Sequence, residues 1–103
     1  MAMPDTIIKP QTRAKPKVER PKLYKVILIN DDYTPREFVV RVLKAEFRMD
    51  EAQAARVMLT AHQRGVCVVA VFTREVAETK ATRATDAGRA KGYPLLFTIE
   101  PEE

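Results

Sequence analysis

The sequence of 103 residues contains no tryptophan and no serine, only three glycines, and a single cysteine and a single histidine. One cysteine, Cys67, cannot form an internal disulfide. Together with one histidine, His62, it is too little for the usual zinc sites, which take several such residues. Without serine there is no Ser-His-Asp nucleophile, and three separated glycines make no glycine-rich phosphate loop. We therefore expect no metal site, no cofactor and no catalytic residues.

Long apolar segments are also absent. No uninterrupted run approaches the ~20 residues that a membrane-spanning helix needs. The first ten residues, MAMPDTIIKP, contain no apolar signal segment. With 46% hydrophobic and 31% charged residues, the composition is typical of a small globular protein. We expect a monomer in the reducing cytoplasm, with no membrane contact.

Residues 23–103 carry no excess of positive charge. The net charge is +4, and residues 1–22 account for all of it with six basic and two acidic residues. The same segment holds four of the seven prolines. We expect residues 1–22 to be a disordered basic extension and residues 23–103 to be one folded domain. The neutral domain argues against a nucleic-acid surface, but a small RNA- or ribosome-associated protein that binds through its basic extension stays an alternative.

Apolar patterning after the extension predicts alternating strands and helices. A largely buried strand spans residues 23–29. A helix follows and ends near residue 48; its expected N-cap is Thr34, its first residue Pro35, and its capping-box partner Glu37.

The remaining elements follow from the same signals. A second helix spans residues 50–64, with Asp50 as N-cap and Gly65 in the left-handed position after its end. Residues 66–72 predict a strand that is too apolar to be exposed on both faces. Thr73 caps a third helix over residues 74–91, and the last strand spans residues 93–100. This order, β-α-α-β-α-β, predicts an α+β fold in which three helices pack on one face of a three-stranded antiparallel sheet.

Two places carry more polar groups than a scaffold requires. At the end of the first strand, Asn30 is followed by two aspartates, Asp31 and Asp32. A surface turn explains one aspartate, whereas two adjacent like charges also suit a site that holds a cation. On the second helix, His62 follows Met58 by four residues, so both lie on one face. A surface role for the histidine and a core role for the methionine are the alternatives.

If the strand end and the helix end meet in space, their acceptors suit an α-ammonium group. Such a group offers three N–H donors and one positive charge. Met58 and Ala61 would add an apolar patch beside it. The preferred interpretation is a binding site for a peptide N-terminus whose first side chain is large and apolar. An esterase or peptidase that uses Asp31 and His62 is the enzymatic alternative.

Four segments closely resemble the ClpS family, the adaptors of the bacterial Clp chaperone-protease. They are LYKVILINDDYTPREFV, VMLTAHQRGV, VFTREVAETK and YPLL, in this order. The resemblance covers nearly all of residues 23–99. It implies a non-enzymatic adaptor that binds N-degron proteins, which begin with Phe, Leu, Trp or Tyr. The adaptor hands them to the N-terminal domain of the AAA+ unfoldase ClpA.

Position by position, the resemblance implies three groups of site residues. The α-amino group would be bound by Asn30, Asp31, Asp32, Thr34 and His62. The first side chain would enter a pocket lined by Thr34, Pro35, Arg36, Val39, Met58, Ala61 and Leu95. The unfoldase would be contacted by Glu75 and Lys80, and the N-terminal extension would engage it during hand-over.

Two positions depart from the family pattern. Arg36 stands where well-known members have methionine, and Ala61 stands where they commonly have valine. The first change places a charge at the pocket mouth, and the second removes two methyl groups from its rim. Because a methylene-scale change alters binding by ~1–3 kcal/mol, we expect an altered ranking of first residues rather than lost binding. The two changes suggest a second ClpS copy, such as some bacteria carry.

Overall fold

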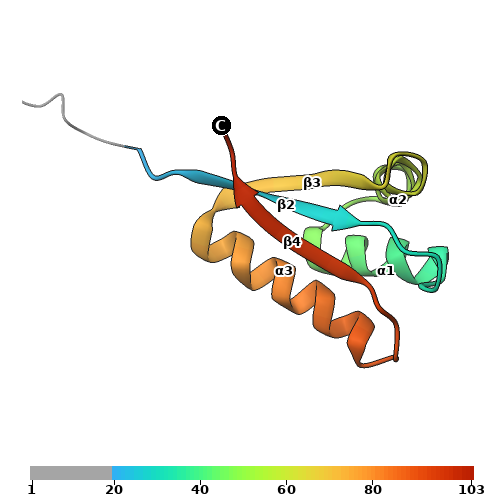
Figure 1. Cartoon of the computed structure of the whole chain (residues 1–103). Coiled ribbons are helices and arrows are strands. Elements are labelled where there is room, and N and C mark those ends of the chain that lie inside the picture. Colours follow the sequence, from blue (N-terminus) through green and yellow to red (C-terminus); the bar gives the residue numbers. More distant parts are fainter. Residues whose placement is uncertain (1–19) are drawn as a thin grey trace, which may run out of the picture.

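The computed structural model describes residues 20–103. The predicted extension lies outside the described residues, except for residues 20–22 before the first strand. The elements are β2 (Leu23–Ile29), α1 (Arg36–Phe47), α2 (Glu51–Arg64), β3 (Val66–Thr73), α3 (Arg74–Arg89) and β4 (Leu96–Pro101). This order confirms the predicted α+β class (Figure 1).

The three strands form one antiparallel sheet in the order β3-β2-β4. The strand β2 is therefore the central one, which explains why it is the most buried of the three. Its last residue, Ile29, pairs with Val66 on one side and with Leu96 on the other. The residue that follows, Asn30, thus leaves the sheet between the starts of both neighbouring strands.

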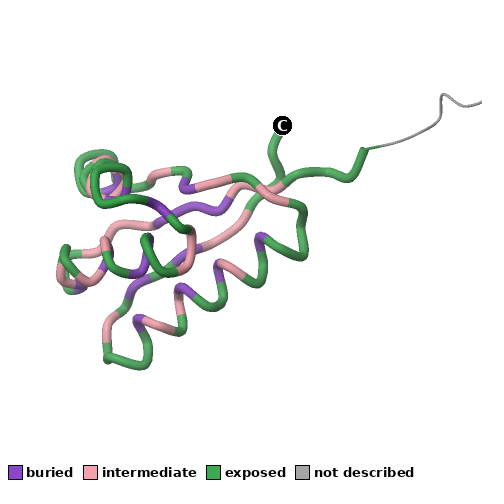
Figure 2. Tube along the Cα trace, turned by 180° about the vertical axis from the view of Figure 1, so that it is seen from behind, coloured by how far each residue is buried: buried purple, intermediate pink, exposed green. Residues whose placement is uncertain are grey.

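Helix α3 packs across one face of the sheet and contacts all three strands, while α1 packs against α2 and α3. The buried side of α3 carries only small residues, Ala77, Ala81, Ala84 and Gly88. Small side chains allow a close approach to the sheet, so the larger core residues come from α1, the strands and the loop residues Met49 and Leu95. Figure 2 shows the buried positions gathered where helices and strands face one another. On the open face of the sheet, Val66 and Val68 are about half exposed, at 49% and 48%.

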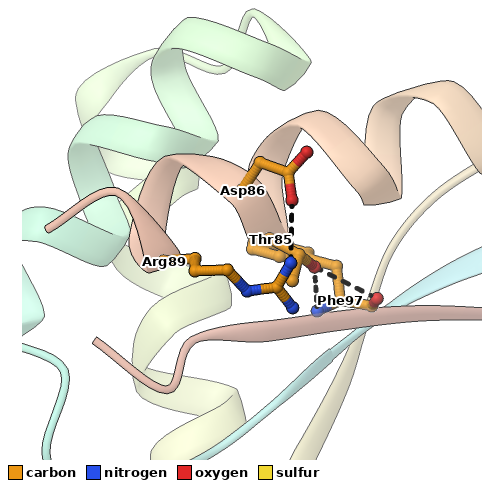
Figure 3. Close-up of polar contacts among 4 residues, drawn as sticks. All are labelled: Thr85, Asp86, Arg89 and Phe97. Atoms are coloured by element: carbon orange, nitrogen blue, oxygen red, sulfur yellow. Dashed lines mark hydrogen bonds and ion pairs between the residues drawn. The ribbon is translucent and has the colours of Figure 1, made fainter. Parts of the chain in front are cut away.

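The free edge of β4 is closed by a side chain from α3 (Figure 3). Thr85 Oγ1 accepts a hydrogen bond from the Phe97 N–H at 3.0 Å and lies 3.4 Å from the Phe97 carbonyl oxygen. One turn further along α3, Arg89 pairs with Asp86 at 3.3 Å. Because unpaired strand edges invite pairing with other chains, Thr85 protects this edge at Phe97.

The predicted cap of the first helix is wrong. The N-cap is Pro35, which has no side chain able to accept a hydrogen bond, and the helix begins at Arg36. The Thr34 hydroxyl instead donates to the Asp31 carboxylate at 2.9 Å, within the loop that precedes the helix. The other caps agree better with the prediction: Asp50 accepts from the Gln53 N–H at 2.8 Å, and Gly65 has a φ of 92°.

The last helix and the last strand are both shorter than predicted. Helix α3 ends at Arg89, and residues 93–95 form a loop before β4. The Tyr93 N–H donates to the Gly88 carbonyl at 2.9 Å, so this backbone belongs to the turn that ends the helix. Pro94 has no N–H to give to a strand ladder. The loop therefore leaves Leu95 outside the sheet, where its side chain can line a cavity.

Candidate functional site

One cavity of about 280 Å³ lies where the end of β2, the start of α1, the second half of α2 and the loop before β4 meet. Every residue predicted for the amino group or for the side-chain pocket lines it. These residues are Asn30, Asp31, Asp32, Thr34, Pro35, Arg36, Val39, Met58, Ala61, His62 and Leu95. The two polar places of the sequence are thus adjacent in space, as their interpretation as one site requires.

A single hydrogen bond ties the strand end to the helix end. The Asn30 N–H donates to the Gly65 carbonyl at 2.9 Å. Gly65 turns the chain from α2 into β3 through a left-handed conformation, which favours glycine. Because β3 then pairs with β2, the last turn of α2 is held beside the loop at Asn30. This is how His62 comes to face residues more than thirty positions earlier.

The Asp31 carboxylate organises the loop. Its Oδ1 accepts the N–H groups of Tyr33 and Thr34 at 2.8 and 2.7 Å, and its Oδ2 accepts the Thr34 hydroxyl. A carboxylate offers about four lone-pair directions, so three are taken up by the loop itself. Asp31 is therefore the aspartate that forms the surface turn, as one of the two sequence interpretations expected. Asp32 is exposed and supplies the second charge of the cavity wall.

His62 is in contact with Arg36 across the mouth of the cavity. Arg36 Nη2 lies 2.7 Å from His62 Nε2. A guanidinium can only donate, so His62 Nε2 is the acceptor in this contact. The predicted amino-binding histidine thus already accepts a hydrogen bond from a cation of the same chain.

The bottom of the cavity is apolar and rigidly packed. Val39, Ala61 and Leu95 are buried, and Met58 is partly buried. Leu95 packs on Gly88 of α3, where a Cβ atom would lie 2.7 Å from the Leu95 Cβ. The residue at position 88 must therefore be a glycine for Leu95 to stand where it does. Sequence reasoning missed Gly88, because a lone glycine inside a helix pattern gives no sign of what it faces.

Sequence reasoning also missed three lining residues: Leu28, Ile29 and Tyr33. The two strand residues were predicted only as core. Tyr33 could have been predicted as a site residue, because an aromatic side chain in a polar turn is exposed and therefore available to a ligand. It is 81% exposed.

The two residues predicted to dock on the unfoldase lie elsewhere, in a groove between the end of α1 and α3. Glu75 is exposed. Lys80 is partly buried: its Nζ donates to the Glu46 carbonyl at 2.9 Å and lies 5.6 Å from the centre of the Phe72 ring. Lys80 is therefore bound within the domain, whereas Glu75 faces solvent.

A family-model comparison matches residues 19–98 to "ATP-dependent Clp protease adaptor protein ClpS". The chain belongs to the ClpS family. This membership confirms the resemblance and the expectation of an adaptor rather than an enzyme, which removes the esterase or peptidase alternative.

Similar ClpS proteins come from several bacteria. The chain is 76% identical to the Clp protease adapter protein ClpS 2 of Mesorhizobium japonicum, over 98% of this chain and 100% of the relative. It is 79% identical to ClpS 1 of Bradyrhizobium diazoefficiens over the same shares. Relatives numbered 1 and 2 are thus about equally similar, and the status of a second copy stays a prediction.

A solved ClpS structure has the same fold. The structure of Agrobacterium tumefaciens ClpS2 bound to L-phenylalaninamide matches with a TM-score of 0.80 and 65% identity, over 81% of this chain and 100% of that chain. Within residues 20–103, no helix is both long and apolar enough to cross a membrane.

Proposed function

We propose that this ClpS protein binds other proteins by their N-terminal residue and delivers them to a ClpA-type AAA+ unfoldase. The substrates are N-degron proteins that begin with Phe, Leu, Trp or Tyr. The observation that carries the proposal is the cavity with polar acceptors at its mouth and an apolar bottom. The bound ligand of the Agrobacterium relative supports it, since L-phenylalaninamide pairs a free α-amino group with an aromatic side chain.

The polar mouth suits the α-ammonium group. Asn30 and Asp32 supply an amide oxygen and a carboxylate, and Asp31 keeps one lone-pair direction free after its loop contacts. His62 adds an imidazole on the opposite wall. Acetylation of the amine would remove the charge and most donors, so an acetylated N-terminus is a poor ligand. The two adjacent aspartates then have distinct tasks, because one shapes the loop and the other attracts the cation.

The apolar bottom suits a large unbranched or aromatic side chain. Val39, Met58, Ala61 and Leu95 offer carbon surface without a charge. Burying a Phe or Leu side chain there contributes roughly 1.5–3 kcal/mol. A small first residue such as glycine forgoes this contribution and leaves the space unfilled.

Delivery requires a second surface, for which Glu75 is the best candidate. Glu75 is exposed at the start of α3, next to Val76, which is 42% exposed. In a protein contact, an exposed apolar residue such as Val76 suits the apolar centre and a charged one such as Glu75 suits the polar rim. Lys80 has a supporting role: it holds this part of α3 against α1 by its hydrogen bond to the Glu46 carbonyl.

The test is a titration of the full chain with a labelled Phe-initiated peptide, followed by fluorescence anisotropy. The matched ligands are the same peptide with an acetylated N-terminus and one that begins with glycine. We expect saturable binding of the first and at least tenfold weaker binding of the other two. Equal affinity for all three would refute the proposal.

A further inference from the structure

Arg36 stands at the rim of the cavity, where it contacts His62 at 2.7 Å. We propose that Arg36 makes the site select N-termini in which an acidic side chain, Asp or Glu, directly follows the first residue. This inference rests on the proposed function, because it concerns the part of the ligand that leaves the same cavity.

The first step is a competition for one lone pair. A neutral imidazole has a single nitrogen that can accept a hydrogen bond. In His62 that nitrogen is Nε2, and the Arg36 guanidinium occupies it. An incoming α-ammonium, which can only donate, needs the same lone pair. His62 therefore becomes available to the ligand only when Arg36 turns away from it.

The second step concerns charge. The guanidinium and the α-ammonium are both positive, so a displaced Arg36 next to the bound amine is repelled by it. Asp31 is held by the loop through three of its acceptor directions, and Asp32 is assigned to the amine, so neither serves the displaced guanidinium. A carboxylate on the ligand itself, close to the amine, removes the repulsion. The planar guanidinium pairs with a carboxylate through two parallel hydrogen bonds, a geometry that lysine or methionine cannot offer.

The third step concerns the place where such a carboxylate would lie. Arg36 and Met58 line the cavity and also a neighbouring surface groove that continues along α1. Around this groove stand three basic side chains, Arg36, Arg41 and Lys44, against two acidic ones, Glu37 and Glu51. Lys44 and Glu51 are paired with each other at 2.6 Å. Apart from this ion pair, the charged residues that line the groove are the two arginines and Glu37, which leaves a surplus of one positive charge.

The experiment compares ligands that differ only in their second residue. Peptides that begin Phe-Glu, Phe-Gln and Phe-Lys, and the N-acetylated Phe-Gln peptide, are titrated with the full chain and with Arg36→Gln. Arg56→Gln is the matched control, because Arg56 is an exposed arginine of α2 that lines neither the cavity nor the groove.

We expect the native chain to bind Phe-Glu at least threefold more tightly than Phe-Gln, and Phe-Lys less tightly than either. In Arg36→Gln the ratio of Phe-Glu to Phe-Gln falls to about one, and Phe-Gln binds at least as well as to the native chain because His62 has been released. Arg56→Gln keeps the native ratio. A native ratio of one, or a ratio that Arg36→Gln leaves unchanged, overturns the inference.

The two proposals fail in different ways. If Phe-Gln binds, its acetylated form does not, and the ratio is one, the proposed function stands and only the role of Arg36 is refuted. If the acetylated and free peptides bind alike, or none binds, the proposed function fails and this inference falls with it.

Discussion

Gly88 and Leu95 are packed so closely that the cavity depends on the missing side chain of the glycine. A Cβ atom at position 88 would lie 2.7 Å from the Leu95 Cβ and 3.3 Å from its Cδ2. Leu95 sits in a loop and is only 3% exposed, so it has little room to retreat except toward the cavity.

Gly88→Ala is therefore expected to impair binding. The added methyl group pushes Leu95 toward the space that the first side chain needs, and overpacking of this kind costs ~1–3 kcal/mol. We expect a loss of affinity for a Phe-initiated peptide of several-fold or more, together with a lower melting temperature. Thr82→Ala, an exposed change on the same helix, is the control and should leave both quantities close to native. Native affinity of Gly88→Ala would mean that Leu95 yields elsewhere.

Asp31→Asn and Asp31→Ala should separate charge from loop geometry. An asparagine keeps one oxygen that can accept the N–H groups of Tyr33 and Thr34, and its amide can donate to the Thr34 hydroxyl. Alanine loses all of these contacts. We expect Asp31→Ala to weaken binding of the Phe-initiated peptide by at least tenfold and Asp31→Asn to weaken it less. Titration of both variants decides this, and equal losses would assign the whole effect to the charge.

His62→Ala should weaken binding of the same peptide by at least tenfold, since an acceptor on one wall of the cavity is lost. Burial of an ammonium whose hydrogen bond is not replaced is costly. Gln63→Ala, which changes the next residue but lines no part of the cavity, is the control for helix stability. If both variants bind like the native chain, His62 has no part in recognition.

Lys80 and Glu75 should behave differently, although both were predicted for unfoldase docking. Lys80→Met removes a charged hydrogen bond to the end of α1 and a contact with aromatic rings, so we expect a loss of roughly 1–3 kcal/mol in the free energy of unfolding. Glu75→Gln should unfold like the native chain in urea but bind the N-terminal domain of the unfoldase less tightly. The reverse pattern would contradict the division of roles.

Burial raises the pKa of the Cys67 thiol, and the nearby positive charge of Arg64 lowers it by a smaller amount. Only the thiolate is nucleophilic, so a raised pKa means less of it at pH 8. Alkylation by iodoacetamide should be slower in the folded chain than in urea, and its rate should keep rising at a pH where the rate of the unfolded chain has levelled off. A folded chain that reacts as fast as the unfolded one would show that Cys67 is not protected.

Much of the fold could be predicted from local patterns. The apolar central strand, the glycine after α2 and the alanine stripe of α3 each reflect a preference that acts over a few residues. The errors arose at the ends of elements, where hydrogen bonds within the adjoining loop or turn prevailed over the expected pattern. Thr34 was predicted as a cap, but its hydroxyl donates to the Asp31 carboxylate and the helix begins at Arg36, with Pro35 as N-cap. The last strand was predicted too long because Tyr93 hydrogen-bonds back to α3.

The candidate site divides in the same way. The sequence alone determined which residue types are present: two aspartates after a strand, one histidine on a helix face, and an arginine at the start of a helix. Only the tertiary structure decided their geometry, because pairing of β2 with β3 and the bond from Asn30 to Gly65 bring the helix end to the loop. It also decided which of their lone pairs are occupied, by Thr34 in one case and by Arg36 in the other. The bond from Thr34 to Asp31 spans only three residues, whereas the contacts of Asn30 with Gly65 and of Arg36 with His62 join groups remote in sequence, and no local preference encodes those.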